Sequence, residues 1–210
     1  MSAPHPTGRP PLTDRPGAPA TTAGPIGPGT FVAVVGASGV GKDSLIAYAS
    51  QRLGPRVSVP RRAVTRPAGP GEDHLPVTEH ELAHGLATGA YACHWQAHGL
   101  RYGVPSSADE VVRAGRVVLA NVSRAAVAGL ERRYADLRVV LVTASGPVRA
   151  ARLARRGRES HDDVARRLAR ADPAPGQRAD LVLVNDGPLA QAGDALTTFL
   201  CGILRRGEPG

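Results

Sequence analysis

The 210-residue chain is poor in lysine, aromatic residues and cysteine, and each shortage excludes a class of protein. Lys42 is the single lysine, so arginine supplies the other 25 of the 26 basic residues. Aromatic residues make up 3% of the chain and offer little for stacking on nucleic-acid bases. The two cysteines, Cys93 and Cys201, form no CxxC motif and indicate neither a disulfide framework nor a thiolate metal site.

Long apolar runs are also missing. No stretch approaches the ~20 apolar residues of a membrane span, and the N-terminus lacks the apolar region of a secretory signal. We therefore expect a cytoplasmic protein without a membrane partner. The formal net charge of +8 is compatible with nucleic acid, with phosphorylated metabolites or with a simple arginine bias, so the positions of the charges must decide.

The first 30 residues differ in composition from the rest. They hold eight prolines and five glycines with almost no large apolar side chain, which predicts a disordered extension. At Phe31 the run FVAVVG begins, which is typical of a strand buried on both faces. We therefore place one folded domain at residues 31–206 and a short tail at 207–210.

Further apolar runs alternate with helical patterns. Strands are predicted at Val117–Val122, Leu137–Thr143 and Leu181–Val184. This alternation predicts an α/β fold, a parallel sheet with helices on both faces. The predicted helices are Lys42–Leu53, Glu79–Leu86, Ser107–Ala114, Arg124–Tyr134, Pro147–Arg156, Asp162–Ala171 and Leu189–Leu204. A weaker pattern at about residues 60–105 predicts an inserted subdomain.

A phosphate-binding loop follows the first strand. Its pattern, G-x-x-x-x-G-K between a strand and a helix, is that of P-loop NTPases. Its glycines allow backbone N–H groups to point at a phosphate, and Lys42 is expected on the β and γ phosphates of ATP. The predicted nucleotide-binding residues of this segment are Gly36, Ala37, Ser38, Gly39, Val40, Gly41, Lys42, Asp43 and Ser44.

Asp43 stands where this motif usually has a serine or threonine that binds Mg²⁺. A carboxylate is also a hard oxygen ligand, so we hypothesise that Asp43 holds the metal directly or through water. The alternative is that Asp43 only complements the positive N-terminus of the helix. Ser44 lies about 100° further round the helix and faces elsewhere.

Arginines are concentrated in the C-terminal half, between residues 149 and 170. Helical spacing places Arg149, Arg152 and Arg170 on a solvated face. The sequence RRGRES interrupts the helical pattern at Gly157. It therefore predicts an arginine-bearing lid at about residues 155–170 that can close over a transferring phosphoryl group.

The segments GASGVGKD, VTRPAGPGED, HGLRYG and LARRGRESHDDVARRLA resemble the guanylate-kinase-like branch of nucleoside monophosphate kinases. The resemblance implies a P-loop core, an acceptor-binding insert and a lid. Of the two phosphate-binding arginines of the guanylate kinase loop, Arg66 is retained and Gly69 replaces the other. Cys93 falls near the position of the glutamate that reads guanine, and Asn121 lies in the stretch where an acidic residue is expected.

A closer resemblance, carried by GKDS, HWQAHGLRYGV, VLANVSRA and VNDG, is to the ribose 1,5-bisphosphate phosphokinases of phosphonate degradation. That family makes 5-phosphoribosyl 1-diphosphate from ribose 1,5-bisphosphate and ATP. The resemblance implies catalytic roles for Lys42 and the lid arginines, and places Asn185 near the adenine. The lid arginines are Arg156, Arg166 and Arg167. The implied acceptor-binding residues are Arg66, Glu72, Arg101, Tyr102, Asn121, Ser123 and Arg124.

Several alternatives stay open at this point. Tyr102 is equally compatible with packing, Glu72 with simple solvation, and Asn185 with an ordinary Asn-Asp-Gly turn. A guanylate or other nucleoside monophosphate kinase is the second functional hypothesis, and a non-catalytic binding module is the third. The intact P-loop argues against the third, and the sequence leaves a homodimer open.

Overall fold

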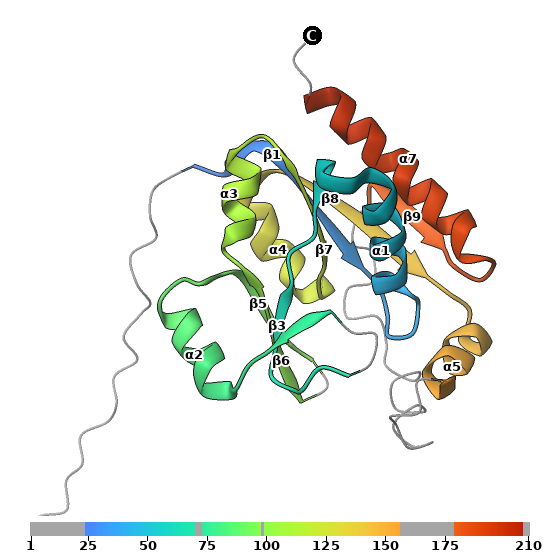
Figure 1. Cartoon of the computed structure of the whole chain (residues 1–210), viewed down its shortest axis with the longest axis horizontal. Coiled ribbons are helices and arrows are strands. Elements are labelled where there is room, and N and C mark those ends of the chain that lie inside the picture. The colour runs from blue at the N-terminus through green and yellow to red at the C-terminus, as the bar shows by residue number, and fades with distance from the viewer. Residues whose placement is uncertain (1–23, 70–72, 98, 156–178, 208–210) are drawn as a thin grey trace, which may run out of the picture.

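The computed structural model describes residues 24–69, 73–97, 99–155 and 179–207. Its core is a five-stranded parallel sheet with the order β2-β7-β1-β8-β9, and helices cover both faces (Figure 1). The strands are β1 (Ile26–Val35), β2 (Val57–Ser58), β7 (Val117–Asn121), β8 (Tyr134–Thr143) and β9 (Leu181–Val184). The predicted α/β class with a parallel sheet is confirmed.

Alternate side chains of β1 enter two separate apolar cores. Val32 and Val34 pack towards α1 (Lys42–Leu53) and α7 (Leu189–Gly207). Phe31, Ala33 and Val35 pack towards the opposite layer, formed by α3 (Ser107–Arg113) and α4 (Arg124–Arg133). Because both faces of β1 are covered, its sequence is continuously apolar rather than alternating.

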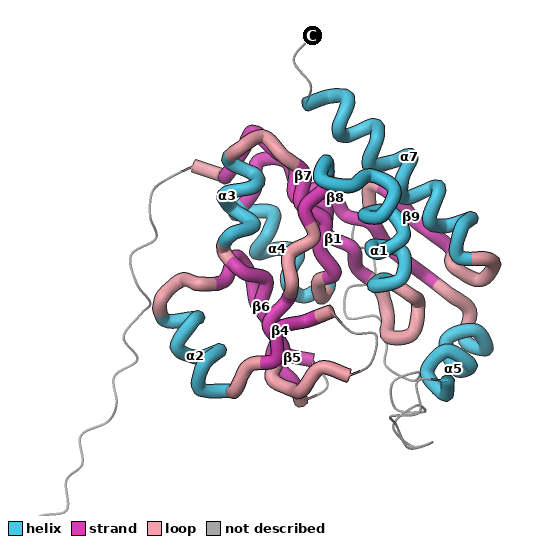
Figure 2. The backbone as a smooth tube through the Cα atoms, viewed as in Figure 1, coloured by secondary structure: helices cyan, strands magenta, loops and turns pink. Residues whose placement is uncertain are grey.

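A second, smaller sheet is built from the weakly patterned middle of the sequence. Its strand order is β4-β3-β6-β5, and it lies beside the core sheet together with α2 (Figure 2). These elements are β3 (Arg62–Val64), β4 (His74–Pro76), α2 (Glu79–Ala87), β5 (Tyr91–Ala97) and β6 (Leu100–Pro105). We call this segment, residues 62–105, the insert.

The structure moves one boundary of the folded domain. α1 and β9 have the predicted bounds, but β1 begins at Ile26, five residues before the predicted start at Phe31. The prediction of disorder is therefore wrong for residues 26–30. Thr30 is 6% exposed and its hydroxyl donates to Asp136 of β8 at 2.7 Å, a long-range pairing that a local composition of glycine and proline does not indicate. Residues 1–23 lie outside the described part.

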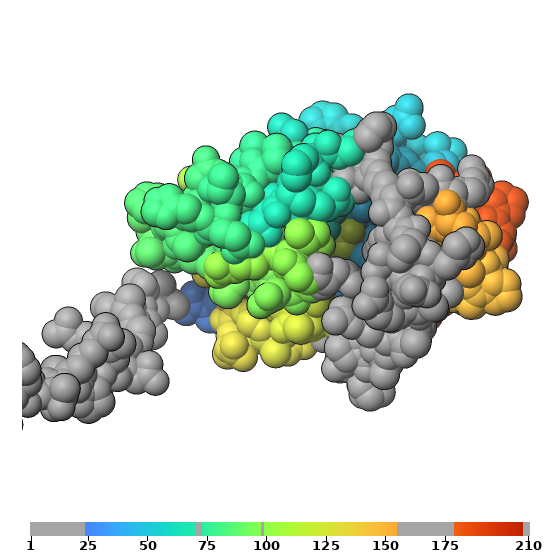
Figure 3. Space-filling view, turned by 90° about the horizontal axis from the view of Figure 1, so that it is seen from below, coloured from blue at the N-terminus to red at the C-terminus, as the bar shows by residue number. Residues whose placement is uncertain are grey.

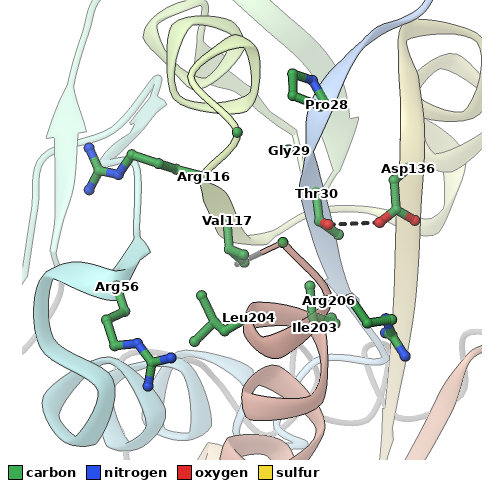
Figure 4. A pocket seen from close by; sticks show the side chains of 12 residues that line it. Pro28, Gly29, Thr30, Arg56, Arg116, Val117, Asp136, Ile203, Leu204 and Arg206 are labelled. Atoms are coloured by element: carbon green, nitrogen blue, oxygen red, sulfur yellow. Dashed lines mark hydrogen bonds between the residues drawn. The ribbon is translucent and has the colours of Figure 1, made fainter. Parts of the chain in front are cut away.

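A cavity of about 290 Å³ lies at the amino ends of β1, β7 and β8 (Figure 4). Arg56, Arg116 and Arg206 are among the residues that line it. The P-loop follows the carboxyl end of β1, so this cavity lies at the other end of the sheet from the predicted site. Among the described helices, none combines the length and apolarity needed to cross a membrane.

Candidate nucleotide and acceptor site

The carboxyl ends of the parallel strands bring the predicted site residues together. β1 runs into the P-loop, β7 ends at Asn121 and β9 is followed directly by Asn185. Val34 of β1 is in register with Asn121 on one side and Val140 of β8 on the other, so these ends share one edge of the sheet. Figure 3 shows a hollow on this side, next to the insert, which is coloured green. Ligands of open parallel sheets bind at such an edge.

The P-loop curls around its own lysine. The Nζ of Lys42 donates to the carbonyl oxygens of Gly36 at 2.7 Å and Ala37 at 3.0 Å. Gly41, which precedes α1, has a φ of +93°, a conformation that favours glycine. The loop therefore has the compact form that a phosphate-binding loop requires, and the ammonium group of Lys42 is bound to the loop's own backbone.

Asn185 packs directly under the P-loop. It is 3% exposed, and its Nδ2 donates to the carbonyl of Val40 at 2.8 Å. A Cβ on Gly41 would lie 2.6 Å from the same Nδ2. The Oδ1 of Asn185 is buried without a hydrogen-bond partner in the part of the chain that is described. Asn185 thus supports the P-loop in addition to following β9, while its contact with adenine stays a prediction.

Two arginines of α5 (Gly146–Arg155) support the same loop. Arg149 donates from Nε to the carbonyl of Ser38 at 3.1 Å, and Arg152 donates from Nη1 to that of Val40 at 3.3 Å. The prediction of a solvated face is therefore wrong for both residues. The physical reason is Leu153, which is 1% exposed and packs beside Gly39, so that α5 lies on the P-loop.

The carboxylate of Asp43 is held from two directions. Its Oδ1 accepts a hydrogen bond from Nδ2 of Asn121 at 2.7 Å and another from Nη2 of Arg62 at 3.0 Å. Asn121 is 9% exposed and belongs to the core sheet, whereas Arg62 belongs to the insert. Ser44, the next residue of α1, is exposed. Asp43 is therefore the point at which the P-loop helix, the core sheet and the insert meet.

The remaining predicted acceptor residues of the core sit at the start of α4. The Ser123 hydroxyl caps this helix by accepting from the backbone N–H of Ala125 at 3.3 Å. Arg124 follows, and partial burial lowers the pKa of its guanidinium. A hydroxyl, a guanidinium and the amide of Asn121 therefore lie within four residues of the chain.

On the insert side, Arg66 and Arg101 lie on neighbouring segments. The backbone N–H of Arg101 donates to the hydroxyl of Thr65 at 2.9 Å, which places Arg66 next to the start of β6. The Arg101 guanidinium pairs with Glu79 at 3.4 Å. Tyr102 stacks on Trp95 with ring centroids 5.2 Å apart, so its ring packs in the sheet. Glu72, Arg156, Arg166, Arg167 and Arg170 lie outside the described residues.

Cys93 of β5 packs against the apolar cluster that α3 and α4 form on this face of the core sheet. Burial raises the pKa of the Cys93 thiol to about 12, so the thiol is neutral at physiological pH. Asp109 of α3 is 3% exposed and accepts hydrogen bonds from Arg133 and, at 2.7 Å, from the Tyr134 hydroxyl. Its charge is therefore compensated within this cluster.

Arg62, Arg149 and Arg152 are the site residues that sequence reasoning missed. Arg62 is the first residue of β3, whereas Arg61 lies just before this strand, so the sequence alone does not distinguish the two. Arg61 pairs with exposed Asp73. For Arg149 and Arg152, the signal available in the sequence is that their helix follows the carboxyl end of a strand, at the edge of the sheet where the P-loop lies.

The described residues contain no cluster of three or more His, Cys, Asp or Glu that could hold a metal ion. A resident transition-metal site of protein ligands is therefore not indicated in the described part. Mg²⁺ suits the donor set better, because it is commonly held by one or two carboxylates together with substrate phosphates and water. Asp43, whose side chain is 60% exposed, fits that requirement.

Known proteins resemble this chain over most of its length. Residues 29–201 match the family model of guanylate kinases. A protein of Pseudofrankia inefficax named ribose 1,5-bisphosphate phosphokinase PhnN is 60% identical over 171 residues, 81% of this chain and 90% of that protein. A protein of Chelativorans sp. with the same name is 48% identical, over 81% of this chain and 84% of its own.

The fold also matches solved structures. A guanylate kinase from Anaplasma phagocytophilum superposes with a TM-score of 0.62 over 85% of this chain and 87% of its own, at 17% identity. The chain therefore belongs to the guanylate kinase family, among relatives that carry the name ribose 1,5-bisphosphate phosphokinase.

Proposed function

We propose that this kinase transfers the γ-phosphoryl group of ATP to ribose 1,5-bisphosphate, yielding 5-phosphoribosyl 1-diphosphate and ADP. The bond between the γ-phosphorus and the β,γ-bridging oxygen breaks, and a new bond forms to an oxygen of the sugar 1-phosphate. The observation that carries the proposal is the pairing of Asn121 with Asp43, because it puts an amide donor at the end of β7. An amide donor suits an anionic acceptor better than an acid would.

The residue near the position of the guanine-reading glutamate, Cys93, supports the same acceptor. A carboxylate accepts hydrogen bonds from the guanine edge, whereas the neutral thiol of Cys93 is a weak donor and a weak acceptor. Arg66 and Arg101 of the insert and Arg124 of α4 are proposed to provide positive charge for the acceptor instead. An acceptor with two phosphates and no base matches these groups.

The chemistry needs little more than positioning and charge neutralisation. The attacking phosphate oxygen is already an anion, so no general base is required. Backbone N–H groups of the P-loop and the ammonium of Lys42 bind the β and γ phosphates of ATP. Asn121, Ser123 and Arg124 orient the acceptor, which brings the two reacting groups together.

Asp43 would hold Mg²⁺, directly or through water. The metal supplies charge neutralisation on the ATP phosphates when it is bound. Arg156, Arg166 and Arg167 are proposed to place further positive charge on the γ-phosphoryl group. Glu72 is proposed to orient Arg66 or a ribose hydroxyl.

We further propose a cytoplasmic enzyme of phosphonate catabolism that uses ATP and Mg²⁺ and takes a phosphorylated sugar from solution. A nucleic-acid partner is not expected, because aromatic residues make up 3% of the chain. A homodimer stays an open prediction, and size-exclusion chromatography with light scattering would decide it.

The deciding experiment compares acceptors. The protein is incubated with ATP, Mg²⁺ and either ribose 1,5-bisphosphate or GMP, and the products are followed by phosphorus NMR. We expect 5-phosphoribosyl 1-diphosphate from the first acceptor and at least about a hundredfold lower kcat/KM with GMP. Efficient formation of GDP would contradict the proposal in favour of a nucleoside monophosphate kinase.

The metal role of Asp43 has its own test. We expect Asp43→Ala to raise the Mg²⁺ concentration needed for half-maximal turnover, while the variant still binds metal-free ATP. An unchanged Mg²⁺ dependence would remove Asp43 as a ligand and leave only its interaction with the N-terminus of α1.

A further inference from the structure

Arg62 links the insert to the P-loop helix. It lies in β3 of the insert, and its Nη2 donates to Oδ1 of Asp43 in α1 at 3.0 Å. Its side chain is 18% exposed, whereas that of its neighbour Arg61 is 59% exposed and pairs with Asp73. Arg62 therefore points towards the P-loop helix, whereas Arg61, which precedes β3, is exposed.

The pairing of Arg62 competes with the role proposed for Asp43. Oδ1 of Asp43 already accepts hydrogen bonds from Asn121 and Arg62. Mg²⁺ and a guanidinium are both cations and repel each other when they share one carboxylate. Binding of the metal–nucleotide complex therefore weakens the attraction that holds Arg62 on Asp43.

The acceptor offers Arg62 another anion. The loop of residues 65–72 contains one arginine, Arg66, because Gly69 stands where guanylate kinases have a second phosphate-binding arginine. Arg62 lies four residues before Arg66, and it already points towards the core. Its planar fork can bind a phosphate through two parallel hydrogen bonds.

We infer that Arg62 is a second acceptor-phosphate arginine, released from Asp43 when the metal–nucleotide complex binds. This inference rests on the proposed function for the identity of the acceptor. It makes the binding of the two substrates cooperative, because each one favours the state in which Arg62 has left Asp43. By linkage, the acceptor must strengthen metal–nucleotide binding by the same factor.

Binding measurements without turnover test the inference. Calorimetry would measure the affinity for ribose 1,5-bisphosphate with and without Mg²⁺ and the non-hydrolysable analogue β,γ-methylene-ATP. The proteins are the wild type, Arg62→Gln and the matched control Arg61→Gln. In the wild type and the control, we expect the Mg²⁺ complex of β,γ-methylene-ATP to increase the affinity for the acceptor.

Arg62→Gln is expected to lose this tightening and to bind the acceptor at least about tenfold more weakly in the presence of the analogue. The same variant should bind the Mg²⁺ complex of β,γ-methylene-ATP with an affinity equal to or higher than that of the wild type, because the guanidinium that competes for Asp43 is gone. If Arg62 only held Asp43 in place, its replacement would have the opposite effect and weaken binding of the Mg²⁺ complex of β,γ-methylene-ATP.

Two results would overturn the inference: acceptor affinity of Arg62→Gln within twofold of the wild type, or weaker Mg²⁺-analogue binding by that variant. Failure of the proposed function looks different, since the wild type would then bind GMP and not the sugar. In that case, the affinities of Arg62→Gln and Arg61→Gln would be compared with GMP as the acceptor. A wild type that binds neither acceptor contradicts both proposals.

Discussion

The side-chain amide of Asn121 donates a 2.7 Å hydrogen bond to the carboxylate of Asp43, and so joins the end of β7 to the first turn of α1. We expect Asn121→Leu to loosen this carboxylate, because Leu has similar volume and no donor. The Mg²⁺ concentration for half-maximal turnover should rise about fivefold to tenfold. Equal Mg²⁺ requirements in variant and wild type would show that Arg62 alone positions Asp43.

Gly41→Ala should damage the P-loop. Its φ of +93° is unfavourable for alanine, and the new Cβ would lie 2.6 Å from Nδ2 of Asn185. We expect the free energy of unfolding to fall by about 1–3 kcal/mol and ATP binding to be lost. Gly129→Ala is the control, because Gly129 lies within α4 with open space around it. That change should stabilise the protein by up to about 1 kcal/mol in the same denaturation measurements.

The arginines of α5 should contribute to nucleotide binding. Arg149 and Arg152 hold the carbonyls of Ser38 and Val40 and place positive charge beside the loop. We expect the double variant Arg149→Gln, Arg152→Gln to bind ATP about tenfold more weakly by calorimetry. A second double variant, Arg132→Gln, Arg205→Gln, removes the same charge from exposed helix ends. If both double variants lose the same affinity, net charge and not loop support is responsible.

Asp109→Asn should destabilise the fold in a pH-dependent way. Burial alone would raise the pKa of Asp109, but hydrogen bonds from Arg133 and Tyr134 outweigh it and hold the pKa below its ordinary value. The ionised group therefore stabilises the protein above pH ~3.9, and the contribution is lost as the pH falls through the lower folded-state pKa.

At pH 7, the variant should lose about 2–4 kcal/mol of unfolding free energy, because Arg133 is left without its anion. The difference from the wild type should shrink below about pH 4 in thermal unfolding experiments. Asp73→Asn breaks an exposed ion pair with Arg61 and should cost at most about 1 kcal/mol. A constant effect of Asp109→Asn from pH 3 to 7 would contradict this account.

The sequence predicts most of the core because the signals there are local. The glycines and the lysine of the P-loop define the start of α1, and continuous apolar runs define the buried strands. The N-terminal part of β1 has no such signal. Ile26 and Thr30 belong to the sheet because they pair with Tyr134 and Asp136, more than a hundred residues away in the chain.

The sequence predicts the phosphate-binding loop of the site, but it does not predict the arginines that contact this loop and Asp43. Arg149 and Arg152 have the spacing of a solvated face, and only the packing of Leu153 on Gly39 turns them towards the loop. Arg62 belongs to the second sheet and reaches Asp43 of α1, a contact that no spacing within the chain encodes. Tertiary packing decides these contacts, so a single sequence without the fold does not reveal them.

The ammonium group of Lys42, which donates to two carbonyls of its own loop, is the only side-chain amine of the protein. An amine-directed acylating reagent therefore meets a single side chain, apart from the terminal amine, and that side chain belongs to the nucleotide loop. We expect bound nucleotide to protect this one position, so that the extent of labelling reports the fraction of vacant P-loops. Occupancy of the loop can thus be read by mass spectrometry in a mixture, without any assay of turnover.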